Sequence, residues 1–195
     1  LRLVGSEMCI RDRVTAAAAG ITISGNTTDL TAALVTTETN AVVANGKVTI
    51  TNTEGNVAAT VLSAIGDSTG GTVTATGAIT VTGTTEEITN ALVTASKLVV
   101  ASNESAAVKF VGDNPTGAQL ALINPKVSGT ITLANNAQTF GGTAAQMKAA
   151  FTGGLEGTQT GAVTISDTSG TIAATTLTDI TCLLYTSPSP RDVEE

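Results

Sequence analysis

The chain has 195 residues, of which 42% are hydrophobic, 2% aromatic and 13% charged, and its formal net charge is −7. It has no His, which excludes His-based acid/base chemistry, and its acidic balance excludes the basic patch that nucleic acid binding requires. No apolar run reaches the roughly 18 residues of a membrane-spanning helix, and the mean hydropathy of +0.28 is too high for a chain kept disordered by charge. We therefore expect one folded domain or a short repeat array.

The two ends differ in composition from the rest of the chain. All Arg, both Cys and the single Tyr lie outside residues 14–181. Residues 182–192, CLLYTSPSPRD, back-translate to DNA that resembles a transposase-type sequencing adapter, and the reverse complement of that DNA encodes residues 3–12, LVGSEMCIRD. We therefore expect residues 1–13 and 182–195 to be adapter-derived and non-native, to make few contacts and to carry no function.

Residues 14–181 are acidic and free of Cys. Five of the 16 Asp and Glu lie in the two ends, which leaves eleven against five Lys. No disulfide is expected within this region.

An internal repeat organises these residues. Residues 48–65, VTITNTEGNVAATVLSAI, align without gaps with residues 163–180, VTISDTSGTIAATTLTDI, and ten of the eighteen positions are identical. A shorter copy at residues 108–123 lies between them, so the period is about 58 residues. We predict three repeats, and the last is truncated: residues 14–71, 72–129 and 130–181.

A second sequence module begins at residues 21, 79 and 138 and repeats at the same spacing. Each of its three copies contains a predicted helix. Each copy has apolar residues at i, i+3 and i+4, which form one stripe of a helix. The three stripes are Leu30, Ala33 and Leu34; Ile88, Ala91 and Leu92; and Met147, Ala150 and Phe151. We expect Leu34, Leu92 and Phe151 to be buried at equivalent positions.

The start of this helix is predicted by capping signals. Thr84 with Glu87, and Thr143 with Gln146, have the capping-box spacing, in which each N-cap and N3 side chain bonds the other residue's backbone N–H. The first copy has Asn26 as its cap and Asp29 in place of Glu.

Strict alternation of apolar residues with Thr predicts strands at residues 48–50, 73–75 and 79–81. A shorter helix is expected after Val57, with Val57, Val61 and Ile65 on one side, and Ile123 and Ile180 are the buried equivalents of Ile65. Each repeat thus reads strand, strand, helix, strand, helix, an order that favours parallel pairing. The predicted fold is α/β, a repeat solenoid with parallel strands and short helices; the alternative is a mainly β solenoid or sandwich.

Residues 73–92, VTATGAITVTGTTEEITNAL, and residues 170–180, GTIAATTLTDI, resemble the Thr/Ala/Val/Gly-rich tandem repeats of very large secreted or cell-surface proteins of marine bacteria and cyanobacteria. The resemblance implies an extracellular or cell-surface location. Such proteins often carry calcium-binding nonapeptide arrays, but this chain has neither a G-G-x-G-x-D repeat nor a D-x-D-x-D-G loop. No cofactor is expected, and calcium is the only candidate.

No catalytic, cofactor-binding or metal site is predicted. Residues 14–181 have neither His nor Cys, which excludes the usual nucleophile systems, zinc and haem. The adjacent acids Glu86 and Glu87 are explained by their place at a helix N-terminus. Residues 66–71 resemble a phosphate loop but lack the Lys that follows one, so we expect a turn.

Alternating threonines place hydroxyls on one strand face, a geometry also found in ice-binding solenoids. They are Thr49, Thr51 and Thr53; Thr72, Thr74 and Thr76; and Thr80 and Thr82. Any half-exposed strand alternates in this way, and helices between the strands argue against the flat rank that ice requires.

We expect a non-catalytic spacer or adhesive stalk segment of a large secreted bacterial surface protein. Its partners would be neighbouring repeats of the same chain and extracellular or cell-surface glycans, with no nucleic acid and no membrane span. The gene is expected to continue on both sides with further units, a secretion signal and a surface anchor. The alternatives are a calcium-, glycan- or ice-binding repeat module, or a solenoid enzyme whose active residues lie elsewhere.

Overall fold

The computed structural model describes residues 20–36, 45–94, 98–100, 106–153 and 155–185. The described strands are β1 (Thr22–Gly25), β2 (Lys47–Ile50), β3 (Glu54–Ala58), β4 (Val73–Ala75), β5 (Ala78–Gly83), β6 (Leu98–Val100), β7 (Ala107–Phe110), β8 (Ile131–Thr132), β9 (Phe140–Gly142) and β10 (Val163–Ile165). The helices are α1 (Thr27–Leu30) with the π-helical turn η1 (Thr31–Val35), α2 (Ala59–Asp67), α3 (Thr85–Thr89) with the π-helical turn η2 (Asn90–Thr94), α4 (Gly117–Ile123) with the 3₁₀ turn η3 (Asn124–Lys126), α5 (Ala144–Phe151) and α6 (Ala174–Tyr185).

All described strand pairs are parallel, as the sequence predicts for strands linked through helices. They form three sheets, with the orders β1-β2-β4-β6, β3-β5-β7-β8 and β9-β10. In the first sheet Ile23 pairs with Val48, Val48 with Val73 and Val73 with Leu98, so each step advances by the same length of chain. The protein is therefore α/β with parallel sheets and short helices.

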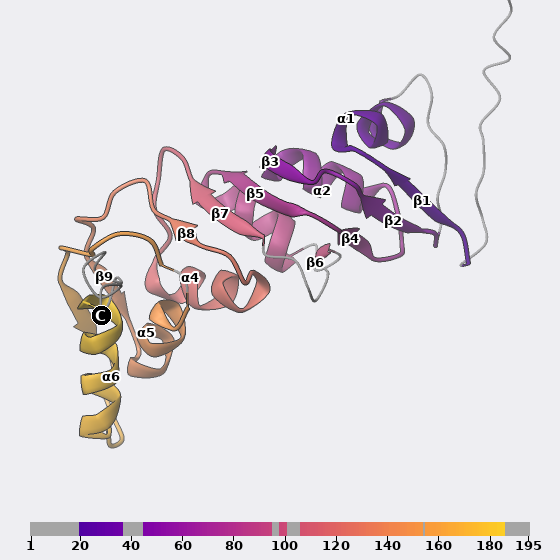
Figure 1. Ribbon diagram of the computed structural model, residues 1–195. Coiled ribbons are helices and arrows are strands. Elements are labelled where there is room, and N and C mark those ends of the chain that lie inside the picture. Colours follow the sequence, from indigo (N-terminus) through magenta and orange to yellow (C-terminus); the bar gives the residue numbers. More distant parts are fainter. Residues whose placement is uncertain (1–19, 37–44, 95–97, 101–105, 154, 186–195) are drawn as a thin grey trace, which may run out of the picture.

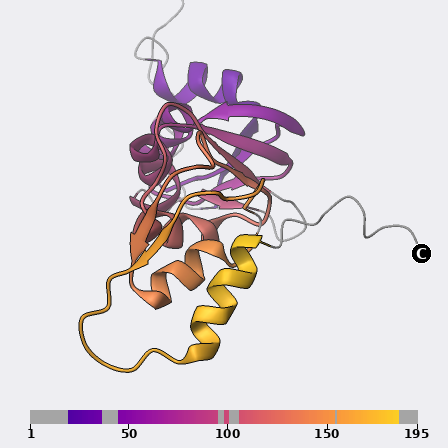
Figure 2. The same ribbon diagram turned by 90° about the vertical axis from the view of Figure 1, so that its left-hand side faces the viewer.

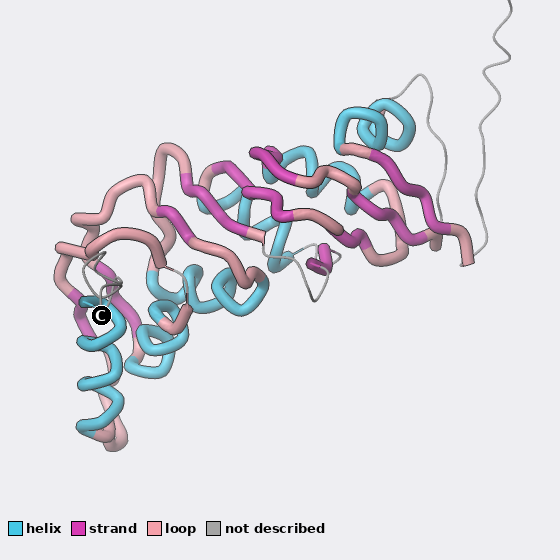
Figure 3. Tube along the Cα trace, in the orientation of Figure 1, coloured by secondary structure: helices cyan, strands magenta, loops and turns pink. Residues whose placement is uncertain are grey.

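The elements follow one another in chain order along an elongated body, from β1 to α6 (Figure 1). Successive helices from α1 to α6 contact one another, and Figure 3 shows them following the strands along the length of the body. The view turned by 90° shows α6 packed at the end of the body next to α5 (Figure 2).

Every second helix begins at a similar interval along the chain. Helices α1, α3 and α5 begin at Thr27, Thr85 and Ala144. Helices α2, α4 and α6 begin at Ala59, Gly117 and Ala174. In both series the interval from one start to the next is close to the period of the sequence repeat, so one period spans two helices.

The core is built from inward-facing strand residues and one stripe of each helix. Val48 and Ile50 are fully buried in β2, whereas Thr49 between them is half-buried, as the alternation predicts. Of the nine residues predicted on the helix stripes, eight are buried. Ala33 is the exception and is exposed, because α1 and η1 are the first described helical segment and no described helix precedes them.

The equivalent core positions are confirmed. Leu34, Leu92 and Phe151 are all buried. Ile65, Ile123 and Ile180 are buried as well. Phe151 also packs edge-to-face on Phe140, with ring centroids 5.3 Å apart, a favourable aromatic geometry.

The predicted caps are present. The boxes of Thr84 with Glu87 and of Thr143 with Gln146 are complete, and the Asn26 side chain accepts from the Asp29 N–H. A further box at the start of α4, made by Thr116 and Gln119, was not predicted.

Three helices also receive a cap from the following strand region. The N–H of Thr27 donates to Asn52 Oδ1 at 2.9 Å, that of Thr85 to Asp113 Oδ1 at 2.8 Å, and that of Ala144 to Asp167 Oδ2 at 2.7 Å. These contacts join segments 23 to 28 residues apart. Each stabilises an N–H that the helix itself leaves unpaired.

The expected order of strand, strand, helix, strand, helix is found in the last repeat (β8, β9, α5, β10, α6), whereas residues 72–129 have two strands, β6 and β7, before their second helix. Residues 166–173 form no strand, although residues 51–58, with which they align, include β3. Helix α6 continues past Thr181 to Tyr185, and Leu183 and Leu184 are half-buried against the core. The expectation of few contacts is therefore wrong for residues 183–184, because an apolar helix stripe continues through them. Residues 1–13 and 186–195 lie outside the described residues.

We predict that Leu92→Ala lowers the free energy of unfolding by about 2–5 kcal/mol, because removing a buried Leu leaves a cavity. Leu92 is 2% exposed, whereas Leu122 is 55% exposed. The matched control Leu122→Ala is expected to change stability by under about 0.5 kcal/mol. Urea unfolding of the two variants measures both values, and equal losses would contradict the assigned helix face.

Candidate functional site

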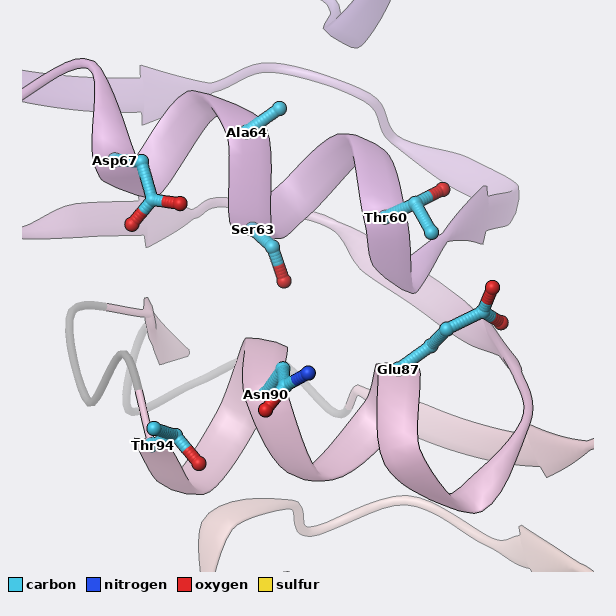
Figure 4. A pocket seen from close by; sticks show the side chains of 7 residues that line it. All are labelled: Thr60, Ser63, Ala64, Asp67, Glu87, Asn90 and Thr94. Carbon is cyan, nitrogen blue, oxygen red and sulfur yellow. The ribbon is translucent and has the colours of Figure 1, made fainter.

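A groove of about 580 Å³ lies between α2 and the α3–η2 segment. It is lined by Thr60, Ser63, Ala64, Asp67, Glu87, Asn90 and Thr94. The first four come from one face of α2, and Ser63 faces Asn90 across the groove (Figure 4). A second groove of about 390 Å³ between α1–η1 and α2 is also rich in threonine.

Among the polar residues that line the larger groove, Glu87 belongs to the capping box of α3. Glu87 Oε2 accepts from the Thr84 N–H at 2.9 Å, and the Glu87 N–H donates to Thr84 Oγ1 at 3.3 Å. Ser63 Oγ is buried and has no hydrogen-bond partner. A serine nucleophile requires a base within hydrogen-bond reach, so this geometry does not activate Ser63.

Of residues 66–71, predicted as a turn, Gly66 and Asp67 are the last two residues of α2, so the prediction is wrong for them, and residues 68–71 form the loop that leads into β4. Ser68 Oγ donates to the Ile65 carbonyl at 2.6 Å. The buried Thr69 donates from Oγ1 to the Gly46 carbonyl and accepts from the Gly71 N–H at 3.0 Å. The hydroxyls of this loop therefore tie it to α2 and to the chain segment before β2.

The described residues hold no group of three or more His, Cys, Asp or Glu side chains arranged to hold a metal ion. Among them, one ion pair is found, between Lys148 Nζ and Asp179 Oδ2 at 2.7 Å, and both side chains are about half exposed. It links α5 to α6 at the surface. None of the helices in the described part of the chain is long and apolar enough to cross a membrane.

A second candidate surface is the outer side of the first sheet. On β2 and β4 its outward side chains alternate with buried residues, and on β1 they alternate with the half-buried Ile23. We call the outward side chains of these three strands and of the residues that flank them the hydroxyl face. The hydroxyl face consists of Thr22, Ser24, Lys47, Thr49, Thr51, Thr72, Thr74 and Thr76.

The rows of the hydroxyl face are in register. Ser24 pairs with Thr49, and Thr49 with Thr74. The ladder extends beyond the strand ends, since the Thr51 N–H donates to the Gly25 carbonyl and the Thr76 N–H to the Ile50 carbonyl. The expectation that helices separate these threonines is therefore wrong, because the crossovers lie beside the sheet and neighbouring strands pair directly.

The other predicted threonines lie apart from these rows. Thr53 follows β2 outside any strand. Thr80 and Thr82 lie on β5 in the second sheet, where Thr80 pairs with Asn56 and Ala107 and Thr82 with Ala58 and Lys109. The second sheet therefore has no continuous hydroxyl row at these positions.

Compared with known proteins, the chain matches no family model, no curated protein and no solved structure.

We predict that Ser63→Ala leaves the free energy of unfolding unchanged or raises it by up to about 1 kcal/mol, because it removes a buried hydroxyl that has no partner. By contrast, Thr84→Ala removes a helix cap and should lower it by about 0.5–2 kcal/mol. Chemical denaturation of both variants tests the pair. A large loss in Ser63→Ala would mean that its hydroxyl has a partner in solution.

Proposed function

We propose that the chain is a segment of a non-catalytic spacer or adhesive stalk, built as a solenoid. One winding of this solenoid is the stretch of chain from one strand to the strand that pairs with it, and successive windings stack on one another. The observation that carries this proposal is the parallel register of the described strands, in which paired strands are separated by a nearly constant length of chain. Such an arrangement lengthens along one axis when a winding is added. Length, rather than a reaction, is then the property that the fold supplies.

The period of the sequence repeat supports a unit of two windings. Helices α1, α3 and α5 each begin with an N-cap side chain. Each also donates a backbone N–H to a second capping side chain, which lies after the following strand region. For α2, the N-cap residue Ala58 has no side-chain cap. Helix α4 has its own capping box at Thr116, so we propose units of two windings, at residues 14–71, 72–129 and 130–181, on the repeat period and the second caps alone.

The contacts between windings support mutual dependence. The buried face of each helix packs on neighbouring helices and strands rather than on its own winding alone. The side chains of Asn52, Asp113 and Asp167 satisfy N–H groups of a preceding winding. One winding in isolation would expose these apolar and polar groups, so an array is the stable form.

The surface chemistry and the resemblance support an extracellular or cell-surface setting. An acidic surface with few Lys disfavours nonspecific contact with anionic partners. The partners proposed are neighbouring repeats of the same chain and surface glycans. No side-chain cluster in the described residues favours the calcium-binding alternative.

A duplication experiment tests the spacer proposal. Residues 59–116 begin with α2 and end at the N-cap of α4, so a second copy inserted after Thr116 would add two windings in phase. We expect one cooperative unfolding transition at no lower denaturant concentration, and a body about 10 Å longer by small-angle scattering, since parallel strands are about 4.8 Å apart.

The matched control is an insertion of the same residues in shuffled order at the same point. This chain should lose stability or gain a flexible loop. If the shuffled insertion were tolerated as well as the duplication, or if the duplicated chain did not lengthen, the spacer proposal would be wrong.

A further inference from the structure

The hydroxyl face combines a regular spacing with an unusual composition. Seven of its eight side chains are Thr or Ser, Lys47 is its only charged residue, and it has no carboxylate and no aromatic ring. The whole chain carries a net charge of −7, so a face without acids is distinct from the remaining surface. We propose that the hydroxyl face binds the surface of ice.

The spacing of the rows fits an ordered layer of water. Neighbouring parallel strands are about 4.8 Å apart, and alternate residues along one strand are about 6.6 Å apart. Ser24, Thr49 and Thr74 occupy one such row across β1, β2 and β4. The strand spacing is close to the repeat of water oxygens in hexagonal ice, so successive hydroxyls of a row meet equivalent lattice positions.

The row is held in place by the core beneath it. Val48, Ile50, Val73 and Ala75 are all at most 1% exposed on the opposite side of the same strands. Threonine is stiff at χ1 because it is β-branched. The Thr76 hydroxyl is further held by donation to the Ile50 carbonyl at 3.1 Å. Little side-chain entropy is therefore lost when a rigid surface binds.

The chemistry favours ice over a soluble or charged ligand. Each threonine offers a hydroxyl that exchanges hydrogen bonds with water and a methyl group that fills the space between water molecules. Ions order water in shells that do not match a lattice, and only Lys47 on this face carries a charge. A glycan surface would be expected to use aromatic platforms, which these strands lack.

The binding surface is independent of the spacer role. A stalk without ice affinity would still lengthen with each added winding, and an ice-binding face would still act in a chain of fixed length. Thermal hysteresis, the gap between the melting and growth temperatures of a seed crystal, therefore tests this inference alone.

The test compares the full chain with Thr74→Tyr and with the control Thr80→Tyr. Both threonines are half-buried, and their strands β4 and β5 are consecutive in the chain. Thr74 lies on the first sheet, whereas Thr80 lies on the second. We expect the parent chain and Thr80→Tyr to hold a seed crystal without growth below its melting point and to produce facets, and Thr74→Tyr to lose both effects. Melting followed by circular dichroism verifies that each variant is folded, and Thr51→Tyr, at an exposed position, replaces Thr74→Tyr if that variant unfolds.

Two outcomes would overturn the proposal. One is a parent chain that neither holds nor shapes the crystal at millimolar concentration. The other is a folded Thr74→Tyr or Thr51→Tyr variant with an unchanged hysteresis gap.

Discussion

The structure depends on parallel pairing between strands that are nearly constant distances apart in the sequence. Because Ile23, Val48, Val73 and Leu98 lie in one register, inward residues stack on inward residues and outward hydroxyls on outward hydroxyls. A shift by one residue would turn the apolar set toward solvent. The chain must return to the same end of the sheet after each strand, and the helices provide that return beside the strands.

Close stacking explains the composition. Gly77 follows β4 where the chain turns toward β5, and a Cβ there would overlap the carbonyl oxygen of Asn52, which follows the paired strand β2. Gly71 and Gly161 likewise leave no room for a side chain against backbone of an adjacent segment. Segments packed this closely favour Gly, Ala, Val and Thr, and the chain has only 2% aromatic residues. Of the three Phe, Phe110 is buried in β7, and Phe140 packs on Phe151 nearer the C-terminal end.

The local features of this fold were predictable from sequence, whereas several long-range features were not. Capping residues such as Thr84 and Glu87 act within four positions, so their spacing predicts the helix start. The caps in which Asn52, Asp113 and Asp167 accept from helix N–H groups act across 23 to 28 residues, and no local pattern marks them. The division into three sheets was missed for the same reason, and the hydroxyl rows were discounted because the sequence does not reveal on which side the helices cross.

Disulfide trapping between Thr49 and Thr74 tests the central register most directly. In a chain with Cys9→Ser and Cys182→Ser, the pair Thr49→Cys and Thr74→Cys would lie on directly paired positions, at a strand spacing of about 4.8 Å that suits a disulfide. We predict that mild oxidation forms an intramolecular bond, whereas the pair Thr49→Cys and Thr80→Cys, on different sheets, does not crosslink. Failure of the first pair to crosslink in the folded chain, or equal crosslinking of both pairs, would contradict the account.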